Sequence, residues 1–409
     1  MATPSIAMTP SAVKAGKVYS VLPSDGIGDF DFTRASTATR INSKGLIETV
    51  ATGVPRLDYS NGDCPSLLLE NQSTNLVTYS ENFSDYSWVK NGSSITSNSV
   101  ISPDGTQNAS TLIGSTVNSR HQIRKGFLNS VDASFSLFVK AKELKYLQIA
   151  SANTGNQYVN FDVESGIIGT AGISFSSAKI ENYGNGWYRV SVVSLNQYNS
   201  YIISLVSGLN VGWLESWVMP NNTDGLYIWG AQLEENSYAT SYIPTLTGTT
   251  QTRSAETCGG VGDASSINSE EGVLYAEISA LANTGTYRSI SLSDGTNTNR
   301  VNLTYSNSNN RLTGFINSNG DNADFNFTQN PITDFIKCAF KYKQNECALW
   351  VNGVEIASTV SQNTFNINTL TELSFTSGSS SSIFEGNTKD LRVYNTALDD
   401  ATLAELTTP

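Results

Sequence analysis

The sequence is poor in the residues that carry most metal and nucleophilic chemistry. Among 409 residues there are one histidine, His121, and four cysteines. A single histidine excludes a site with several histidine ligands and leaves little room for a Ser-His-Asp triad. The cysteines, at 64, 258, 338 and 347, lack the spacing of a zinc site. Neither a metalloenzyme nor a triad hydrolase is therefore expected, and we predict no catalytic and no metal-ligating residues.

Charge is also scarce. Charged residues make up 15% of the chain, whereas an average globular domain has about 25%. The net charge of −12 argues against binding to nucleic acid or to an acidic membrane surface, because both need a basic patch. No apolar run approaches the ~18 residues of a membrane span, and residues 1–13 lack the apolar segment of a signal peptide. We therefore expect a soluble protein that is made in a cytoplasm.

What the chain does contain is typical of β-sandwiches. Hydrophobic residues make up 39% and aromatic residues 10%, which is enough for a buried core in each domain. Short apolar stretches separated by Gly, Asn and Ser recur at the spacing of sandwich or jelly-roll strands. In the middle of the chain they lie at residues 135–140, 146–149, 158–163, 187–193, 201–206 and 226–233. The fold class predicted is all-β.

The length predicts two or three domains. Residues 238–244, beside the φ-fixing Pro244, are interpreted as a strap from one sandwich to the next. This gives an irregular N-terminal arm at 1–75, a jelly roll at 76–255 and a second sandwich at 256–409. The alternative is that the strap is a loop within one large sheet domain. The arm has few apolar pieces, so we expect it to become ordered against a sister subunit or another protein; the alternative is a flexible arm.

The last third of the chain shows one strong hairpin signal. Asn352-Gly353 supplies the two positive-φ positions of a type I′ turn between apolar runs at 349–351 and 354–356. A strand at 389–395 and a short capped helix at 397–406 close the chain. The hairpin and this ending resemble concanavalin A-like (laminin-G-like) sandwiches. The resemblance covers about the last 140 residues.

The same region holds two cysteines that invite a disulfide assignment. If a strand over 336–342 pairs with one beginning at Cys347, then Tyr342 faces Cys347 and Cys338 faces Val351. The two sulfurs would then lie roughly 13 Å apart along one face, too far to be bridged. We interpret both as buried free thiols.

Several motifs in the first 255 residues resemble those of tailed-bacteriophage virion proteins, in the same order. The N-terminal ones are GDFDFTRASTATR at 28–40, GLIE at 45–48, PRLDY at 55–59, CPSLLLE at 64–70 and NLVTYSENF at 75–83, followed by Trp88. The companion motifs are GAQLEE at 230–235, SYIPT at 241–245 and Thr252-Arg253. In addition, GNGWYRV at 184–190 and the GAQL segment look like carbohydrate-binding-module jelly rolls.

The phage resemblance implies a virion protein: a tail fibre, another appendage or a structural protein. We therefore expect a structural adhesion protein, not an enzyme, located in the virion and binding host-surface glycan. Its partners would be other virion proteins, reached through the arm, and sister copies in a homotrimer. The alternatives are a capsid decoration or head-fibre subunit and a polysaccharide-degrading enzyme.

Sugar binding needs an aromatic face beside hydrogen-bonding groups. Trp213 and Trp217 precede the polar loop 220–225 and, if they lie on a strand, their spacing of four puts them on one face. They are the predicted carbohydrate-binding residues; the alternative is that this face belongs to the core. We expect Trp187, Trp229 and Trp350 to be core residues and His121, between Arg120 and Gln122, to be an exposed turn residue.

Acidic residues offer two further candidate sites. The adjacent pairs at 234–235, 270–271 and 399–400 are poorly built for a glycosidase, because neighbours on a strand point to opposite faces. The Glu-x-Asp-x-x-Glu run of concanavalin-like glucanases does not occur. Asp104, Asp224 and Asp294 each precede glycine and are candidate calcium ligands. Asp-Gly is also a common turn pair, and the turn is the preferred interpretation.

Overall fold

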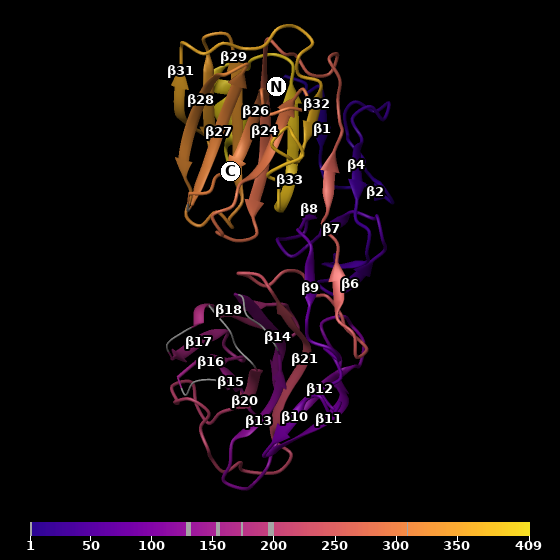
Figure 1. The fold of residues 1–409 in the computed structure, drawn as a ribbon, viewed down its shortest axis with the longest axis vertical. Helices are drawn as coiled ribbons and strands as arrows, with labels where there is room; N and C mark the ends of the chain where they lie inside the picture. The colour runs from indigo at the N-terminus through magenta and orange to yellow at the C-terminus, as the bar shows by residue number, and fades with distance from the viewer. Residues whose placement is uncertain (1, 128–131, 153–155, 173–174, 195–199, 309) are drawn as a thin grey trace. The chain divides into compact units, whose positions relative to one another are not determined.

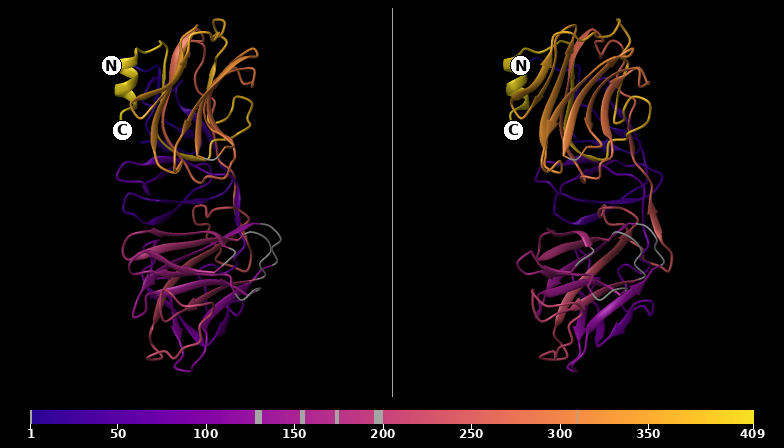
Figure 2. Two further views of the ribbon diagram at one scale, coloured as in Figure 1. Left: turned by 90° about the vertical axis from the view of Figure 1, so that its left-hand side faces the viewer. Right: turned by 60° about the vertical axis from the view of Figure 1, so that its left-hand side comes forward.

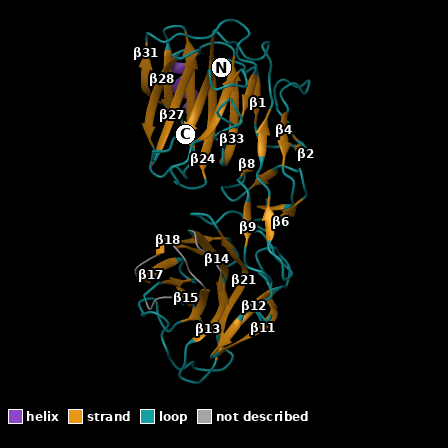
Figure 3. Ribbon diagram, viewed as in Figure 1, coloured by secondary structure: helices purple, strands orange, loops and turns teal. Residues whose placement is uncertain are grey.

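The protein is all-β apart from one short helix among the residues that the structure describes (Figure 3). The computed structural model describes residues 2–409 except 128–131, 153–155, 173–174, 195–199 and 309. The chain divides into two compact units. The first unit comprises residues 1–37, 50–71 and 254–409, and the second comprises 38–49 and 72–253. The predicted fold class is confirmed.

The first unit is a sandwich of an eight-stranded and a five-stranded antiparallel sheet (Figure 1). The larger sheet contains β31 (Val354–Thr359), β30 (Cys347–Val351), β29 (Ile336–Lys343), β24 (Glu271–Ala280), β33 (Gly386–Tyr394), β8 (Ser66–Leu69) and β7 (Arg56–Asp58), with β1 (Ile6–Met8) on β33. The smaller sheet contains β28 (Asp321–Thr328), β27 (Arg311–Ser318), β26 (Asn299–Tyr305), β25 (Arg288–Ser293) and β32 (Glu372–Ser374).

The N-terminal segments differ from the expected arm, because they are paired within the chain. β1 aligns Ile6 with Val393, and β8 aligns Leu69 with Gly386. A four-stranded sheet joins β2 (Val13–Lys14), β3 (Lys17–Val18) and β4 (Phe30–Thr33) to β23 (Thr257–Gly259). Apolar side chains of these strands share one core with the C-terminal strands. The few apolar pieces of residues 1–71 are thus covered by their own chain.

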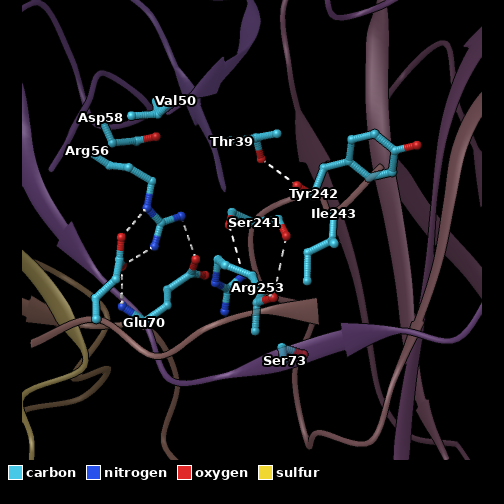
Figure 4. A network of polar contacts seen from close by, with 12 residues as sticks. Thr39, Val50, Arg56, Asp58, Glu70, Ser73, Ser241, Tyr242, Ile243 and Arg253 are labelled. Atoms are coloured by element: carbon cyan, nitrogen blue, oxygen red, sulfur yellow. Dashed lines mark hydrogen bonds and ion pairs between the residues drawn. The ribbon is translucent and has the colours of Figure 1, made fainter. Parts of the chain in front are cut away.

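A cluster of buried charges joins these N-terminal segments to residue 256. Arg56 is fully buried; its Nη1 lies 2.7 Å from Glu70 Oε2 and its Nε lies 2.9 Å from Glu256 Oε1 (Figure 4). Arg34 Nη1 lies 2.7 Å from the same Glu256 oxygen. Burial lowers the pKa of Arg56, but the charges of Glu256 and Glu70 raise it above its usual value. Arg34, Arg56 and Glu70 come from the quoted phage-like stretches, and Glu256 lies three residues after the Thr252-Arg253 motif.

The C-terminal features follow the sequence closely. Asn352 and Gly353 have φ of 48° and 83° between β30 and β31, as a type I′ hairpin turn requires. Asp399 caps helix α1 (Asp400–Thr407) by accepting from the Thr402 backbone N–H. The helix lies on the outer face of the larger sheet (Figure 2), where Leu403 packs near Tyr275 and Trp350. Cys338 pairs with Val351, and Cys338 and Cys347 are buried free thiols, as predicted.

The second unit is a sandwich of two six-stranded antiparallel sheets. One runs β10 (Val89–Asn91), β13 (His121–Gly126), β20 (Ser200–Leu205), β15 (Tyr146–Ser151), β16 (Tyr158–Asp162) and β17 (Ile167–Ala171). The other runs β11 (Ser93–Val100), β12 (Ala109–Gly114), β21 (Gly225–Glu234), β14 (Ala133–Ala141), β19 (Trp187–Ser194) and β18 (Phe175–Asn182). Each predicted strand of this region overlaps one of these elements, and Val163 and Val206 fall one residue beyond β16 and β20.

Shorter segments cover the outer face of the second of these sheets. They are the hairpin of β5 (Ala38–Ile41) and β6 (Ile47–Val50), and the strap, which ends in β22 (Gln251–Arg253) paired with β9 (Ser73–Asn75). Ile47 and Tyr242 pack there with Trp187 and Trp229. Glu234 is fully buried and accepts from Ser73 Oγ at 2.6 Å and from the Thr240 N–H at 2.9 Å. Arg253 Nη1 donates to Thr240 Oγ1 at 2.9 Å and to Ser241 Oγ at 3.1 Å (Figure 4).

Candidate functional site

The two predicted sugar-binding tryptophans do not lie on a strand. Residues 206–219 form a loop, in which Leu214 has φ of 45° and Trp217 makes an isolated bridge with Ser119. A left-handed residue breaks the alternation on which a shared strand face depends. Trp213 packs against the cluster of Ala150, Tyr158, Ile202 and Leu214, whereas Trp217 packs against the main core of the unit. The same-face geometry expected from their spacing is therefore absent.

The loop is held against the outer face of the sheet by two buried amides. Gln148 accepts from the Leu214 N–H at 2.7 Å and donates to Gly212 O at 2.9 Å. Asn160 donates to Val211 O at 2.8 Å. Both amide side chains are fully buried, so the loop backbone obtains partners that a strand neighbour would otherwise supply.

Both indoles are half-buried and engaged. Trp213 Nε1 lies 3.3 Å from Ser151 O, and the Arg120 guanidinium lies 4.9 Å from the centre of the Trp213 ring. Trp217 Nε1 lies 3.3 Å from Leu205 O. His121, expected on an exposed turn, is instead fully buried in β13, with its ring nitrogens 2.7 and 2.9 Å from Gly92 O and Trp217 O. Alternate side chains of a strand point inward, so the polar neighbours Arg120 and Gln122 did not show whether His121 is exposed.

A pocket of about 410 Å³ lies elsewhere in the second unit. Three loops build its walls: the β5–β6 hairpin tip, the β11–β12 loop and the turn between β18 and β19. Its lining residues are Gly45, Leu46, Val100, Ile101, Ser102, Pro103, Lys140, Tyr183, Gly184, Asn185 and Trp187. This volume is near the lower end of the roughly 300–1,000 Å³ of small-molecule sites, so it suits one end group of a glycan.

The β18–β19 turn explains why the pocket forms where it does. Gly184, Asn185 and Gly186 all have positive φ, between 52° and 79°, which glycine and asparagine adopt at low cost. The turn brings Tyr183 and Trp187 to the same place. Trp187 Nε1 donates to Ile101 O at 3.1 Å and so joins this wall to the β11–β12 loop. Trp187 is buried, as predicted for a core residue, but it also lines the pocket.

The pocket combines the groups that sugar recognition uses. Tyr183 is half-buried and supplies aromatic surface, whereas Trp187 is only 2% exposed and supplies little; Ile101 and Leu46 add apolar surface. Asn185 and Lys140 supply amide and ammonium groups that can hydrogen-bond to hydroxyls, whereas the buried Ser102 hydroxyl already donates to Asp104. Convergence of a few polar groups on a largely apolar cavity is the general form of a small-molecule site.

Two carboxylates lie behind the β11–β12 wall. Asn108 Nδ2 is 3.1 Å from both Glu81 Oε2 and Asp104 Oδ2, and Tyr242 Oη donates to Glu81 Oε1 at 3.1 Å. Burial, with a smaller contribution from the Asp104 charge, raises the pKa of Glu81 to about 7. Ser102 Oγ and the Thr106 N–H both donate to Asp104 Oδ1, at 2.6 and 2.7 Å. Neither carboxylate residue lines the pocket.

The other acidic candidates have structural partners. Asp294 accepts from the Thr296 N–H at 2.9 Å, in the manner of Asp104, and Asp224 accepts from Asn221 Nδ2 at 3.0 Å. Glu234 is buried whereas Glu235 is exposed, as expected for strand neighbours. Among the described residues, no group of three or more His, Cys, Asp or Glu could hold a metal ion, and no helix is long and apolar enough to cross a membrane.

The comparisons with known proteins agree with the fold of the C-terminal part. Residues 263–404, about a third of the chain, match the model of the concanavalin A-like lectin/glucanases superfamily. This part of the first unit is therefore similar to concanavalin A-like sandwiches, as its hairpin and capped helix predicted. A comparison with curated protein sequences gives no match.

Solved structures resemble the chain only weakly. The CBM40 module of the IT-sialidase of Ruminococcus gnavus covers 36% of this chain and 93% of its own length, with 18% identity and a TM-score of 0.30. Domain 4 of the arabinanase AbnA of Geobacillus stearothermophilus, in complex with arabinotriose, covers 42% and 84%, with 14% identity and a TM-score of 0.32. Mouse laminin alpha1 domains LG4-5 cover 69% and 89%, with 10% identity and a TM-score of 0.25. At such scores the likeness does not extend to ligands.

Proposed function

We propose that this protein is a non-catalytic glycan-binding protein and that it binds sugar in the pocket between the hairpin tip, the β11–β12 loop and the β18–β19 turn. The observation that supports this most is the pocket itself. It places the half-buried ring of Tyr183 with Asn185 and Lys140 in a cavity of about 410 Å³. Residues 263–404, which are similar to a superfamily that includes lectins, lie in the first unit, so the support for this pocket comes from its own lining residues in the second unit.

The biological setting that we propose is the virion of a tailed bacteriophage. The support is the order of the phage-like motifs and the structural use of their residues. Arg34, Arg56 and Glu70 belong to the buried charge cluster, and Glu234 and Arg253 hold the strap. The protein would be a tail fibre or appendage subunit, made in the host cytoplasm and assembled as a homotrimer by analogy with phage fibres. A capsid decoration or head-fibre subunit is the alternative.

Binding is tested by a glycan array with the purified full-length protein and two pocket variants. Tyr183→Ala should abolish binding because it removes aromatic surface, and Asn185→Ala should weaken it because it removes an amide. Each has a matched control away from the pocket. Tyr86 is 90% exposed in the same unit, and Asn319 is an exposed asparagine with the same φ of 52° as Asn185. If the pocket variants bind as the controls do, sugar is not bound here.

The setting requires two separate measurements. Immunogold labelling of virions should place the protein on the tail; labelling on the head would favour the capsid alternative, and absence from virions would reject the phage assignment. Light scattering should give three copies per particle in solution. A monomer would contradict the trimer and leave the sugar pocket unaffected.

Glu81 and Asp104 are the specific observation that favours an enzyme as the second candidate. A shared amide keeps the two carboxylates close, and a carboxyl group with a pKa of about 7 suits a general acid. Against this, Asp104 is engaged in its own turn and neither residue lines the pocket. Capsule depolymerisation by the wild type, lost in Glu81→Gln, would establish the enzyme; we expect no depolymerisation by either protein.

A further inference from the structure

The pocket carries an unusual charge for this protein. The chain has a net charge of −12, yet Lys140 is the one charged residue among those that line the cavity. No aspartate or glutamate lines it. The local charge of the pocket therefore has the opposite sign to that of the whole chain.

Lys140 is positioned by its strand and by the turn beside it. It lies on β14 opposite Trp187 of β19, and its Nζ donates to Asn185 O at 2.7 Å. A side chain at Gly186 would place its Cβ 3.3 Å from Lys140 Cε, so the glycine leaves room for the lysine stem. The ammonium group thus lies at the turn that forms one pocket wall.

The ammonium group has donors to spare. A lysine ammonium has three N–H donors, and within the described residues Lys140 makes one hydrogen bond and no ion pair. Asp104 follows the lining residue Pro103, but its carboxylate accepts from Ser102, Thr106 and Asn108 instead. The backbone N–H groups of Asn185 and Gly186 also find no acceptor within the part of the chain that the structure describes.

We propose that the pocket selects sugars that carry a carboxylate, and that Lys140 determines this specificity. The inference rests on the proposed sugar binding and names its ligand class: a uronic acid or a sialic acid at the end of a glycan. Lysine recognises such an anion as a point charge with several donors, while Tyr183 contacts the ring. Because the sequence shows no basic patch, it suggests a ligand that is neutral or bound through a few local groups; a single lysine in a pocket is such a local group.

The test uses pairs of sugars that differ only in the acid group. Methyl glucuronide is compared with methyl glucoside, and methyl galacturonide with methyl galactoside, by calorimetric titration of the full-length protein. N-acetylneuraminic acid is titrated as a third acidic probe. A charge-assisted contact should make the preferred acid bind about tenfold or more tightly than its neutral partner, and the preference should shrink at high salt.

Two variants of Lys140 separate charge from packing. Lys140→Met keeps the apolar stem over Gly186 and should remove the acid preference, so that each acid and its neutral partner bind with equal affinity. Lys140→Arg keeps the charge and should retain the preference. A preference for one acidic probe over the others would identify the source of the carboxylate within the proposed class.

The outcomes distinguish the inference from the function beneath it. If wild-type protein binds neutral and acidic partners equally, or if Lys140→Met keeps the preference, then Lys140 does not select the ligand although the pocket binds sugar. If no sugar binds to the wild type and the glycan array is also blank, the proposed function itself fails.

Discussion

The two units share one architecture but bury polar groups in different ways. The first unit holds all four cysteines and one tryptophan, Trp350; the second holds the other five tryptophans and the single histidine. At the base of the first unit, arginines and glutamates are buried as ions. In the second unit, amides and hydroxyls such as those of Gln148 and Thr240 make buried hydrogen bonds to loop segments, together with the buried Glu234.

This difference indicates how each unit holds together segments that are far apart in the sequence. In the first unit, β1 and β8 pair with β33 more than 300 positions away. Arg34 and Arg56 are held to Glu256, 222 and 200 positions away, by paired charges, whose geometry few alternatives satisfy. In the second unit, most pairings are closer in sequence, and loops can leave the sheets to form walls. The pocket belongs to the second unit, and the β5–β6 hairpin in its wall is held by the partly exposed Arg40–Glu48 ion pair as well as by neutral hydrogen bonds.

The largest effect should follow from breaking the charge cluster of the first unit. Arg56→Met leaves Glu70 and Glu256 buried without their main partner, which should lower the free energy of unfolding by about 3–5 kcal/mol. Calorimetry of the full chain measures this change as a shift in the melting temperature of the affected transition. The control is Lys17→Met, because the Lys17–Asp31 ion pair is exposed and should contribute about 0–1 kcal/mol. Equal shifts in the two variants would show that burial does not strengthen the cluster.

In the second unit, a negative charge on Glu81 should lower the stability of the folded protein, whereas the paired charges around Arg56 stabilise the first unit. Because burial raises its pKa from 4.5 to about 7, folded protein keeps the proton over a pH range in which unfolded protein has lost it. Stability of the wild type should therefore fall as pH rises from about 4.5 to 7, by up to about 3 kcal/mol. Glu81→Gln should remove this loss, and the exposed Glu235→Gln should not. If Glu81→Gln loses stability with rising pH to the same extent as the wild type, the pKa of Glu81 is not raised by burial.

The thiol prediction is smaller and concerns the core of the first unit. Cys338 is fully buried, with its sulfur 3.5 Å from Ala276 O. Cys338→Ser should destabilise by roughly 1–3 kcal/mol, because the hydroxyl is more costly to bury. The exposed Cys64→Ser should change stability by less than about 0.5 kcal/mol. Reducing agent should leave the melting temperature unchanged, and a mass-spectrometric link between Cys338 and Cys347 would contradict the register.

The sequence predicted those features that depend on close neighbours. The Cys338–Val351 register, the Asn352-Gly353 turn and the Asp399 cap each follow from a few adjacent residues. The placement of residues 1–71 did not follow, because β1 finds its partner almost 400 residues later. Local apolar content cannot show that a distant edge strand completes the core.

The candidate site was missed for a related reason. The turn at 184–187 was noted as a motif, but its pocket needs the hairpin tip at 45–46 and the loop at 100–103 as well. Their approach depends on contacts such as Ile47 N–H to Pro103 O at 2.9 Å. Leu214 likewise has a positive φ, which its residue type does not predict. Because of this backbone conformation, Trp213 and Trp217 do not share a strand face.

The smallest effect concerns these two tryptophans and decides whether the second unit has a second sugar-binding surface. Both are half-buried, both indole N–H groups are donated to backbone carbonyls, and Arg120 lies over the Trp213 ring. Trp213→Ala and Trp217→Ala should each cost about 1–2 kcal/mol, less than a fully buried tryptophan, because part of each ring already faces water. Glycan binding and host adsorption should fall only in proportion to unfolded protein. Adsorption that drops while the melting temperature holds would instead restore the pair as a binding platform and make Tyr183→Ala the weaker variant.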